Sequence, residues 1–251
     1  QEQLLNELNS IGDSQESSPR RLAFLFSGQG SQRMNMGREL MQAHPVFRES
    51  LQKTASLLDP LMDRALEDIL WDGNATLLQE TRYAQPALFA IELALYSLWK
   101  SWGVVPDFVI GHSLGEIVAS HVAGVFSLED AAALVGTRGR LMHALPSRGS
   151  MASLGLGSEE TTQLINEMNL VGLVSIAGVN SPHQTVISGD DAGIRTVLLH
   201  CASIGKKAQE LVVSHAFHSH FMDPMLEEFR LVAEGVSYHS PKIKIISNLT
   251  G

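Results

Sequence analysis

The chain has 251 residues, of which 44% are hydrophobic and 18% charged, enough to bury the core of one large domain or of a domain with a smaller insertion. Its formal net charge of −9 argues against nucleic acid as the main ligand, and the lack of an apolar run of about 18 residues and of a signal-peptide pattern predicts a cytoplasmic protein with no membrane partner. The single cysteine, Cys201, excludes an internal disulfide and a cysteine-rich metal site, so we expect no bound metal.

The first half of the chain begins with a polar stretch rich in Ser, which predicts a linker over residues 1–20. Apolar runs and helical spacing then predict the following elements: a buried strand over 21–27, helices over 37–58, 61–70 and 87–102, a strand over 108–110, and helices over 116–123 and 128–145. Pro86 directly precedes the helix over 87–102, and we expect it in the first turn, where proline is well tolerated.

Glycine-rich turns follow two of the predicted strands. After the first strand, Gly28-Gln29-Gly30 either makes a plain turn or brings backbone N–H groups to a ligand, and the residues alone leave both open. After the strand over 108–110, Gly111-His112-Ser113-Leu114-Gly115 leads into a helix, which is the pattern of a nucleophile elbow. Such an elbow exposes the Ser113 hydroxyl at a helix N-terminus, where the free N–H of Leu114 favours a negative oxygen. We therefore expect Ser113 to be a nucleophile.

The pattern changes between residues 150 and 213, where short strands alternate with two helices. The predicted order is strand 151–156, helix 158–169, strand 173–179, strand 185–188, helix 191–204 and strand 208–213. This βαββαβ order is typical of a ferredoxin-like unit. We expect an α/β protein with an α/β-hydrolase-like large subdomain over 21–149 and 214–251, into which a ferredoxin-like small subdomain over 150–213 is inserted. A helix over 221–232 and a strand over 243–247 complete the large subdomain.

A serine is a poor nucleophile until an imidazole accepts its proton, so one of the ten histidines must reach Ser113. Three of them, His215, His218 and His220, lie in a loop that begins where the inserted unit ends. Such a loop is a natural rim for a cleft between two subdomains. His112 neighbours the serine, and we expect its ring to turn away from the hydroxyl. The loop over 215–220 is therefore the predicted source of the base.

Six sequence blocks together carry a resemblance to a known family. The blocks cover residues 26–32, 83–87, 111–116, 137–142, 177–182 and 215–219, and include Phe-Ser-Gly-Gln-Gly-Ser-Gln, Gly-His-Ser-Leu-Gly-Glu and His-Ala-Phe-His-Ser. The chain resembles the malonyl-CoA:acyl carrier protein transacylases, most closely the acyltransferase domains of modular polyketide synthases, from residue 21 to residue 251. The resemblance implies a malonyl-CoA:acyl carrier protein S-acyltransferase of polyketide or fatty acid synthesis, with malonyl-CoA as substrate and no bound cofactor.

The resemblance also implies the roles of the catalytic groups. Ser113 forms an acyl ester, and His218 matches the general base of a Ser-His dyad in a ping-pong transfer to the phosphopantetheine thiol of an acyl carrier protein. The backbone N–H groups of Gln29 and Leu114 match the oxyanion hole, which favours the functional interpretation of the Gly28-Gln29-Gly30 turn. Neighbouring synthase domains are expected partners.

Further residues match the substrate pocket of the family. Arg138 matches the arginine that holds the free carboxylate of a malonyl group, and its planar guanidinium suits bidentate capture of that carboxylate. Gln85 and Asn180 match polar pocket residues that support Arg138 and the catalytic loop. His112 belongs to the same expected substrate-binding set. Phe217 beside His218 fills the space of an α-methyl group, and with Leu114 it predicts a preference for malonyl over methylmalonyl units.

The chain departs from the family pattern in two places. Ser27 stands where the family often has Pro, which we regard as a minor change. The backbone carbonyl that usually orients the catalytic histidine lies downstream of the strand ending near Asn248, so we expect the C-terminal part of the large subdomain to be truncated. A basic rim is expected to meet the acidic carrier protein, with Arg33, Arg148, Lys206 and Lys207 as candidates, although each is better read as an ordinary solvated charge.

Two other functions compete with this interpretation. An esterase or thioesterase of the α/β-hydrolase type also uses GxSxG, but it needs an oxyanion loop of the His-Gly-Gly type and an acidic residue between the serine and the histidine. The chain has no such loop and no acidic residue in a recognisable motif there, and Asp190 and Asp191 stay open as the acid. A non-catalytic docking module would keep the fold without the chemistry. The joint presence of Ser113, His218 and Arg138 argues against it.

Overall fold

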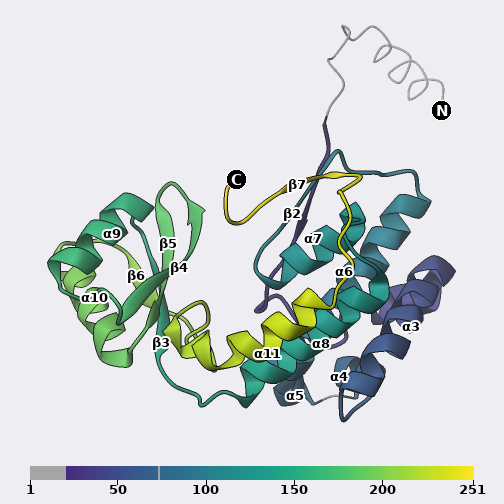
Figure 1. Cartoon of the computed structure of the whole chain (residues 1–251), viewed down its shortest axis with the longest axis horizontal. Helices are drawn as coiled ribbons and strands as arrows, with labels where there is room; N and C mark the ends of the chain where they lie inside the picture. Colours follow the sequence, from purple (N-terminus) through teal and green to yellow (C-terminus); the bar gives the residue numbers. More distant parts are fainter. Residues whose placement is uncertain (1–20, 73) are drawn as a thin grey trace, which may run out of the picture.

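The computed structural model describes residues 21–72 and 74–251, and two sheets organise them (Figure 1). The larger body contains a parallel three-stranded sheet with strand order β1-β2-β7, in which β1 (Ala23–Phe26) and β7 (Lys244–Ile246) flank β2 (Phe108–Gly111). The central strand is the one that leads into Ser113. The predicted linker over 1–20 lies outside the described residues.

Helices cover this sheet and supply most of the core. In chain order they are α2 (Arg38–Ala43), α3 (Pro45–Leu58), α4 (Leu66–Trp71), α5 (Ala75–Gln79), α6 (Thr81–Ser101), α7 (Leu114–Ala123), α8 (Leu128–Ala144) and α11 (Asp223–Glu234), with short 3₁₀ turns η2 (Asp59–Leu61) and η3 (His220–Met222). Figure 1 shows α8 and α11 running side by side along one edge of the larger body. The only helix long enough to be considered as a membrane span, α6, is not apolar enough to be one within the described residues.

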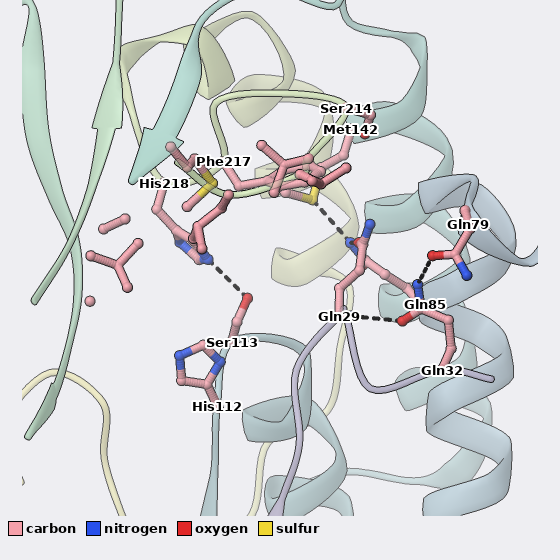
Figure 2. A pocket seen from close by; sticks show the side chains of 18 of the residues that line it. Gln29, Gln32, Gln79, Gln85, His112, Ser113, Met142, Ser214, Phe217 and His218 are labelled. Atoms are coloured by element: carbon pink, nitrogen blue, oxygen red, sulfur yellow. Dashed lines mark hydrogen bonds between the residues drawn. The ribbon is translucent and has the colours of Figure 1, made fainter. Parts of the chain in front are cut away.

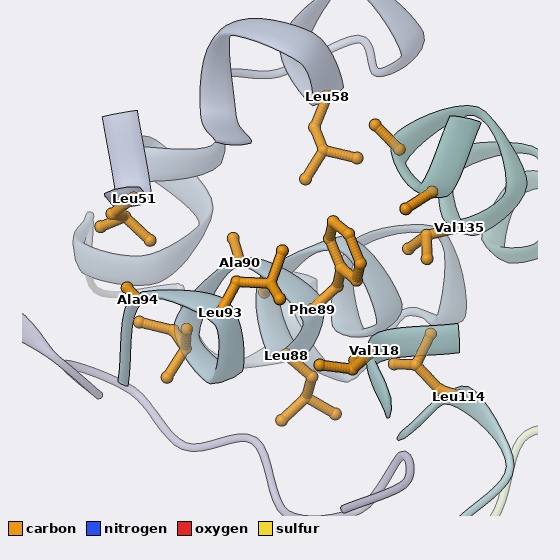
Figure 3. Close-up of a cluster of buried hydrophobic side chains, with 14 of the residues drawn as sticks. Leu51, Leu58, Leu88, Phe89, Ala90, Leu93, Ala94, Leu114, Val118 and Val135 are labelled. Atoms are coloured by element: carbon orange, nitrogen blue, oxygen red, sulfur yellow. The ribbon is translucent and has the colours of Figure 1, made fainter. Parts of the chain in front are cut away.

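The long helix α6 is the centre of the hydrophobic core. Its residues are buried on nearly every side, as expected for a helix enclosed by other elements. Figure 3 shows Phe89 of α6 surrounded by side chains of α3, α7 and α8, including Leu58, Val118 and Val135. Each fully buried Leu, Val or Phe contributes about 1.5–3 kcal/mol by leaving water, so this contact network fixes the position of α7 and of the elbow that precedes it.

The smaller body is a four-stranded antiparallel sheet with strand order β4-β5-β3-β6. Its elements are β3 (Ser150–Leu154), α9 (Ser158–Glu167), β4 (Val174–Ser181), β5 (Gln184–Gly189), α10 (Asp191–Ser203) and β6 (Ala208–Glu210). Both helices pack on this sheet around a separate core that includes Leu154, Ile187 and Cys201 (Figure 1). The strand order is that of a ferredoxin-like unit, so the predicted α/β class with a ferredoxin-like insertion is confirmed.

A third cluster of buried side chains lies where the two bodies meet. It joins residues of α8, β3, η3 and α11 to the loop after β6: Leu141, Met142, Met151, Phe217, Met222 and Met225. The four methionines of this cluster come from four different elements, and the flexible thioether side chain suits such irregular contacts. The cluster holds the loop that carries His218 against the larger body.

Two helix predictions were wrong, and tertiary packing explains the first. Helix α6 begins at Thr81 rather than at residue 87, so Pro86 lies inside the helix. The first turn of α6 packs closely on α8 at Gly139, where an added Cβ would lie 3.2 Å from the Thr81 carbonyl oxygen, and this contact keeps the turn helical despite the missing N–H of Pro86. The helix predicted over 37–58 is divided at His44, whose extended backbone ends α2 before Pro45 begins α3.

One predicted helix and one predicted strand were also longer than the elements in the structure. The helix predicted over 61–70 is only α4, because residues 62–65 are not helical. The last strand of the smaller body ends at Glu210 rather than at residue 213, and the residues that follow contribute to a cavity wall instead. The apolar side chains at 211–213 therefore belong to a cavity wall and not to a strand.

Candidate active site

Ser113 lies at a sharp turn between β2 and α7, as a nucleophile elbow requires. Its backbone has φ 53° and ψ −108°, a conformation that a non-glycine residue adopts only where the surrounding structure enforces it. The enforcing contacts come from the two glycines of the motif. A Cβ on Gly111 would lie 1.9 Å from the backbone of Gly115, and a Cβ on Gly115 would lie 2.3 Å from the Phe26 carbonyl oxygen. The elbow therefore exists only because both positions lack a side chain.

Two side chains from distant parts of the chain converge on the Ser113 hydroxyl. His218 Nε2 is 3.0 Å from Ser113 Oγ, and Arg138 Nη2 donates a hydrogen bond of 2.9 Å to the same oxygen. Figure 2 shows the imidazole facing the serine across the cavity. This is the spacing at which a base can accept the hydroxyl proton.

His218 occupies a loop that the protein holds in a strained form. Its φ of 59° is uncommon for a residue with a side chain, and the loop is braced by Ser219, whose hydroxyl donates to the Ala216 carbonyl oxygen at 2.6 Å. The pKa of His218 is lowered to about 4, mainly because the ring is withdrawn from water, with further contributions from the positive Arg138 and from His112. The imidazole is therefore neutral near pH 7 and free to act as a base.

Arg138 reaches the site from α8 and is oriented by a buried amide. Its Nη1 donates to Gln85 Oε1 at 2.8 Å, and the Gln85 amide nitrogen in turn lies 3.3 Å from Gln29 Oε1 and from Met142 Sδ. Burial lowers the pKa of Arg138 to about 10, so the guanidinium stays charged near pH 7. The site thus contains a fixed positive charge next to the serine.

Two backbone N–H groups beside the serine have no acceptor within the described chain. Leu114 is the first residue of α7, where helix geometry leaves its N–H free. Gln29 lies in the loop after β1, which contacts the elbow: an added Cβ on Gly28 would lie 2.7 Å from His112 Nδ1. These are the two N–H groups that the sequence analysis expects in an oxyanion hole.

A cavity of about 520 Å³ surrounds these groups and opens between the two bodies (Figure 2). Its walls come from both bodies. They include Gln85 and Arg138 of the larger body, Met151, Asn180 and Val186 of the smaller one, and the segment from Leu211 to Ser214. The lining is largely apolar with a few convergent polar groups, which is the usual character of a small-molecule site.

Comparisons with known proteins agree with this geometry. Residues 23–251 match the family model described as the acyl transferase domain. The chain belongs to this acyl transferase family. It is 48% identical over 240 residues to the polyketide synthase GfsA of Streptomyces halstedii, covering 92% of this chain and 3% of that protein. It is 47% identical over 231 residues to a mycoketide-CoA synthase of Mycobacterium tuberculosis, covering 92% of this chain and 5% of that protein.

Solved structures of acyl transferase domains have the same fold. The acyltransferase domain of the second module of the salinomycin polyketide synthase superposes with a TM-score of 0.88 at 43% identity, covering 98% of this chain and 59% of that one. A malonyl-CoA acyl carrier protein transacylase of Coxiella burnetii gives a TM-score of 0.84 at 32% identity, covering 92% of this chain and 73% of that one. The chain thus spans only a small part of the curated synthases that it matches, and the family resemblance found in the sequence is confirmed.

The remaining candidate residues of this acyl transferase domain lie in different surroundings. Asn180 of β4 is exposed on the cavity wall, and within the described chain its side chain makes no hydrogen bond to Arg138. Phe217 borders the cavity while packing among the methionines of the third cluster. His112 also lines the cavity, as expected for the substrate-binding set, and it contributes to the lowered pKa of His218. Within the described chain its ring makes no hydrogen bond to the Ser113 hydroxyl, whose partners are His218 and Arg138.

The side chain of Leu114 does not lie where its predicted role in substrate choice would place it. Its side chain is fully buried in the main core beside Val118 and does not line the cavity, as Figure 3 shows. The part of Leu114 expected to act at the site is its backbone N–H, at the first residue of α7. Any effect of Leu114 on substrate choice must therefore act through the position of α7 and not by contact.

The sequence analysis missed several residues of the cavity. Gln32 and Gln79 hydrogen-bond to each other at 2.9 Å, and Gln32 Oε1 accepts from the Gly30 N–H at 2.7 Å, which braces the loop after β1. Gln32 belongs to the Gly-Gln-Gly-Ser-Gln block and was within reach of a motif argument. Gln79 lies at the end of a short helix with no motif, so only the fold reveals it.

Three other histidines have structural partners. His215 is buried, and its Nε2 lies 2.8 Å from the Leu145 carbonyl oxygen. His121 Nδ1 lies 3.1 Å from the Phe126 carbonyl oxygen. His220 Nε2 lies 3.8 Å from Asp190 Oδ2. Of the three histidines in the predicted loop, His218 is the one that reaches Ser113.

Proposed function

We propose that this acyl transferase domain transfers a malonyl group from malonyl-CoA, through an ester on Ser113, to the phosphopantetheine thiol of an acyl carrier protein. The observation that carries the proposal is the convergence of a neutral imidazole and a charged guanidinium on one serine hydroxyl in one cavity. A base serves any acyl transfer, whereas the guanidinium suits a substrate with a free carboxylate. The solved transacylase of Coxiella burnetii, which is named as a malonyl-CoA acyl carrier protein transacylase, has the same fold.

In the first half-reaction, Ser113 Oγ attacks the thioester carbonyl carbon while His218 Nε2 accepts the hydroxyl proton. Negative charge develops on the carbonyl oxygen, where the N–H groups of Gln29 and Leu114 stabilise it. The carbon–sulfur bond then breaks, and the CoA sulfur leaves with the proton from His218. The products are free CoA thiol and a malonyl ester on Ser113.

The second half-reaction reverses these roles. His218 accepts the proton of the carrier thiol, and the sulfur attacks the ester carbonyl carbon of malonyl-Ser113. The same two N–H groups stabilise the new oxyanion. When the carbon–oxygen bond breaks, Ser113 Oγ takes the proton back from His218, which restores the starting state of the domain.

Arg138 selects the substrate by its charge. A malonyl carboxylate accepts two parallel hydrogen bonds from the guanidinium and takes the place of Ser113 Oγ as the acceptor of Nη2. The Ser113 hydroxyl, which can donate to His218 throughout, then keeps the imidazole as its partner. A simple acyl chain leaves the guanidinium without that partner in a largely enclosed site, which disfavours its transfer.

The geometry does not favour the esterase alternative. The two acidic residues that the sequence left open for this role are engaged elsewhere, because Asp190 lies beside His220 and Asp191 accepts a hydrogen bond from the Ser150 hydroxyl. Neither occupies the position of a triad acid behind His218. We therefore propose a Ser-His dyad without a carboxylate from this chain.

The expected partners are the acyl carrier protein and neighbouring synthase domains. Carrier contact requires a basic rim, and Lys206 is the weakest candidate because it already pairs with Glu160 at 3.5 Å. Arg33, Arg148 and Lys207 remain candidates for this role.

A competition experiment tests the malonyl assignment. When malonyl-CoA and methylmalonyl-CoA compete for the same protein, we expect more malonyl than methylmalonyl product. Phe217→Ser should lower the ratio of malonyl to methylmalonyl product by roughly 10-fold or more, because it opens space for an α-methyl group. The ratio of products is the readout, since it does not depend on how much of the variant is folded. A burial-matched control is Met225→Ser, which opens the same cluster away from the cavity and should leave the ratio unchanged. A lead for methylmalonyl-CoA in the unaltered domain would contradict the assignment.

A further inference from the structure

The loop that carries Gln29 is attached to α6 by a carboxylate that the reaction itself does not use. Glu92 Oε1 accepts two hydrogen bonds from Ser27, one from its N–H at 2.7 Å and one from its hydroxyl at 2.6 Å. Ser27 is the first residue after β1 and lies two positions before Gln29. One oxygen atom therefore fixes both the backbone and the side chain of the residue where the loop begins.

The position of Glu92 is costly for stability. Its Oε2 is buried with no hydrogen-bond partner within the described chain, and the burial of the carboxyl raises its pKa to about 7. The adjoining cavity of about 300 Å³ is lined by residues of β1 and α6, and Glu92 is the one charged residue among them. A leucine would fit this apolar setting better, so core packing does not account for a carboxyl group here.

Other hydrogen bonds hold the rest of the loop. The Gln29 side chain donates to Thr81 Oγ1 at 3.2 Å and accepts from the Gln85 amide at 3.3 Å, so the side chain of Gln29 is also attached to α6. The Ser31 hydroxyl lies 2.7 Å from Ser27 Oγ and donates to the Gly28 carbonyl oxygen at 3.1 Å, which closes the loop on itself. Gln32 and Gln79 hold its far end. At the near end, Ser27 is attached to the helical core through Glu92, on the same helix that carries Gln85.

We propose that Glu92 is a positioning residue that sets the Gln29 N–H in the oxyanion hole by holding Ser27. This inference rests on the proposed function, in which the Gln29 N–H stabilises the oxyanion, because it explains what holds that N–H in place. Oxyanion donors act only when they are correctly placed, and a displacement of about 1 Å costs roughly 100-fold in rate. Glu92 holds Ser27 from the rigid α6. Loss of the Glu92 carboxyl group should therefore slow the reaction of Ser113, although the two residues make no direct contact.

The test compares substitutions that keep or remove the acceptor. Glu92→Gln keeps a carbonyl oxygen for both Ser27 bonds, whereas Glu92→Leu removes the acceptor. We expect Glu92→Leu to lower the rate constant of Ser113 acylation by malonyl-CoA roughly 10- to 100-fold with KM little changed, and Glu92→Gln to recover most of that rate. Ser27→Ala, which keeps the N–H bond and loses the hydroxyl bond, should give a smaller loss. Tyr96→Phe alters the same cavity wall without touching Ser27 and should match the unaltered domain.

A second probe separates this inference from the proposed function. A fluorophosphonate reacts with Ser113 through the same hydroxyl, base and oxyanion donors whatever the natural acyl group is. If the unaltered domain reacts with the fluorophosphonate but not with malonyl-CoA, the proposed function is wrong, and the order of labelling rates among the variants still decides the role of Glu92. Equal labelling rates for Glu92→Leu and the unaltered domain would overturn the inference. So would a Glu92→Gln variant as slow as Glu92→Leu, since an acceptor role predicts rescue. If Glu92→Leu does not fold, Ser27→Ala takes its place in the comparison. A labelling rate of Ser27→Ala equal to that of the unaltered domain would then overturn the inference, and so would a Glu92→Gln variant slower than Ser27→Ala.

Discussion

At the scale of single residues, the protonation state of His218 decides whether Ser113 can react. The pKa of the imidazole lies at about 4, below its ordinary value of 6.5, because the ring is withdrawn from water and faces Arg138. Protonation of a base removes its function, so the active form is the neutral one present above this pKa. Arg138 stays charged over the same range, since its pKa of about 10 lies well above it.

This ionisation predicts an unusual pH profile. As the pH falls from 8 to 5, kcat/KM for malonyl-CoA should stay on a plateau, and it should then fall with a midpoint near pH 4 rather than near 6.5. Fluorophosphonate labelling of Ser113 measured in parallel provides the control, because that reagent lacks the ionisable groups of CoA. A midpoint near 6.5 in both assays would show that His218 is not shielded in the way described.

The sequence predicted single residues well where they belong to a motif. Ser113, His218 and Arg138 stand in recognisable blocks, and the structure brings all three together. Glu92 was not predicted because one glutamate within an apolar helix has no pattern, and its meaning depends on the end of a strand 65 positions away. Gln79 was missed because it belongs to no motif, and its place at the cavity follows only from the fold.

At the scale of elements, the crossing of β1, β2 and α7 determines the elbow. Gly115 on α7 lies against the end of β1, where the Phe26 carbonyl oxygen also accepts a hydrogen bond from the His112 N–H at 2.9 Å. Strand, turn and helix therefore approach more closely than side chains allow. The sequence predicted this unit from its glycines, whereas the start of α6 was misplaced because a packing contact at Gly139 outweighed the local preference of Pro86.

Glycine substitutions test this close approach. Gly115→Ala should destabilise the domain by about 3 kcal/mol or more, because the new Cβ would overlap a backbone carbonyl that cannot move freely. Gly235→Ala is the matched control, since Gly235 has an ordinary φ of −77° and its added Cβ would meet no atom closer than 3.4 Å. Urea unfolding gives both free energies. If both variants unfolded at the same urea concentration, the tight crossing would be ruled out.

At the scale of the whole molecule, residues of both bodies form the site. The larger body supplies Ser113, the guanidinium of Arg138 and the two N–H groups, and the smaller body supplies the opposite wall of the cavity (Figures 1 and 2). The order of strands and helices was enough to predict both sheets, because each follows a local pattern. The shape of the cavity was not predictable from the sequence. It depends on the path of residues 211–219, which pack on the third cluster of buried side chains, where the two bodies meet.

The central claim is that one serine carries the malonyl group between two thiols. Intact-protein mass spectrometry after mixing the domain with malonyl-CoA, followed by peptide mapping, measures this directly. The account predicts one malonyl group per chain, located on Ser113, absent from Ser113→Ala and discharged when a phosphopantetheine thiol is added. The absence of an adduct, an adduct that persists in Ser113→Ala, or release as free malonate faster than transfer to the thiol would contradict it.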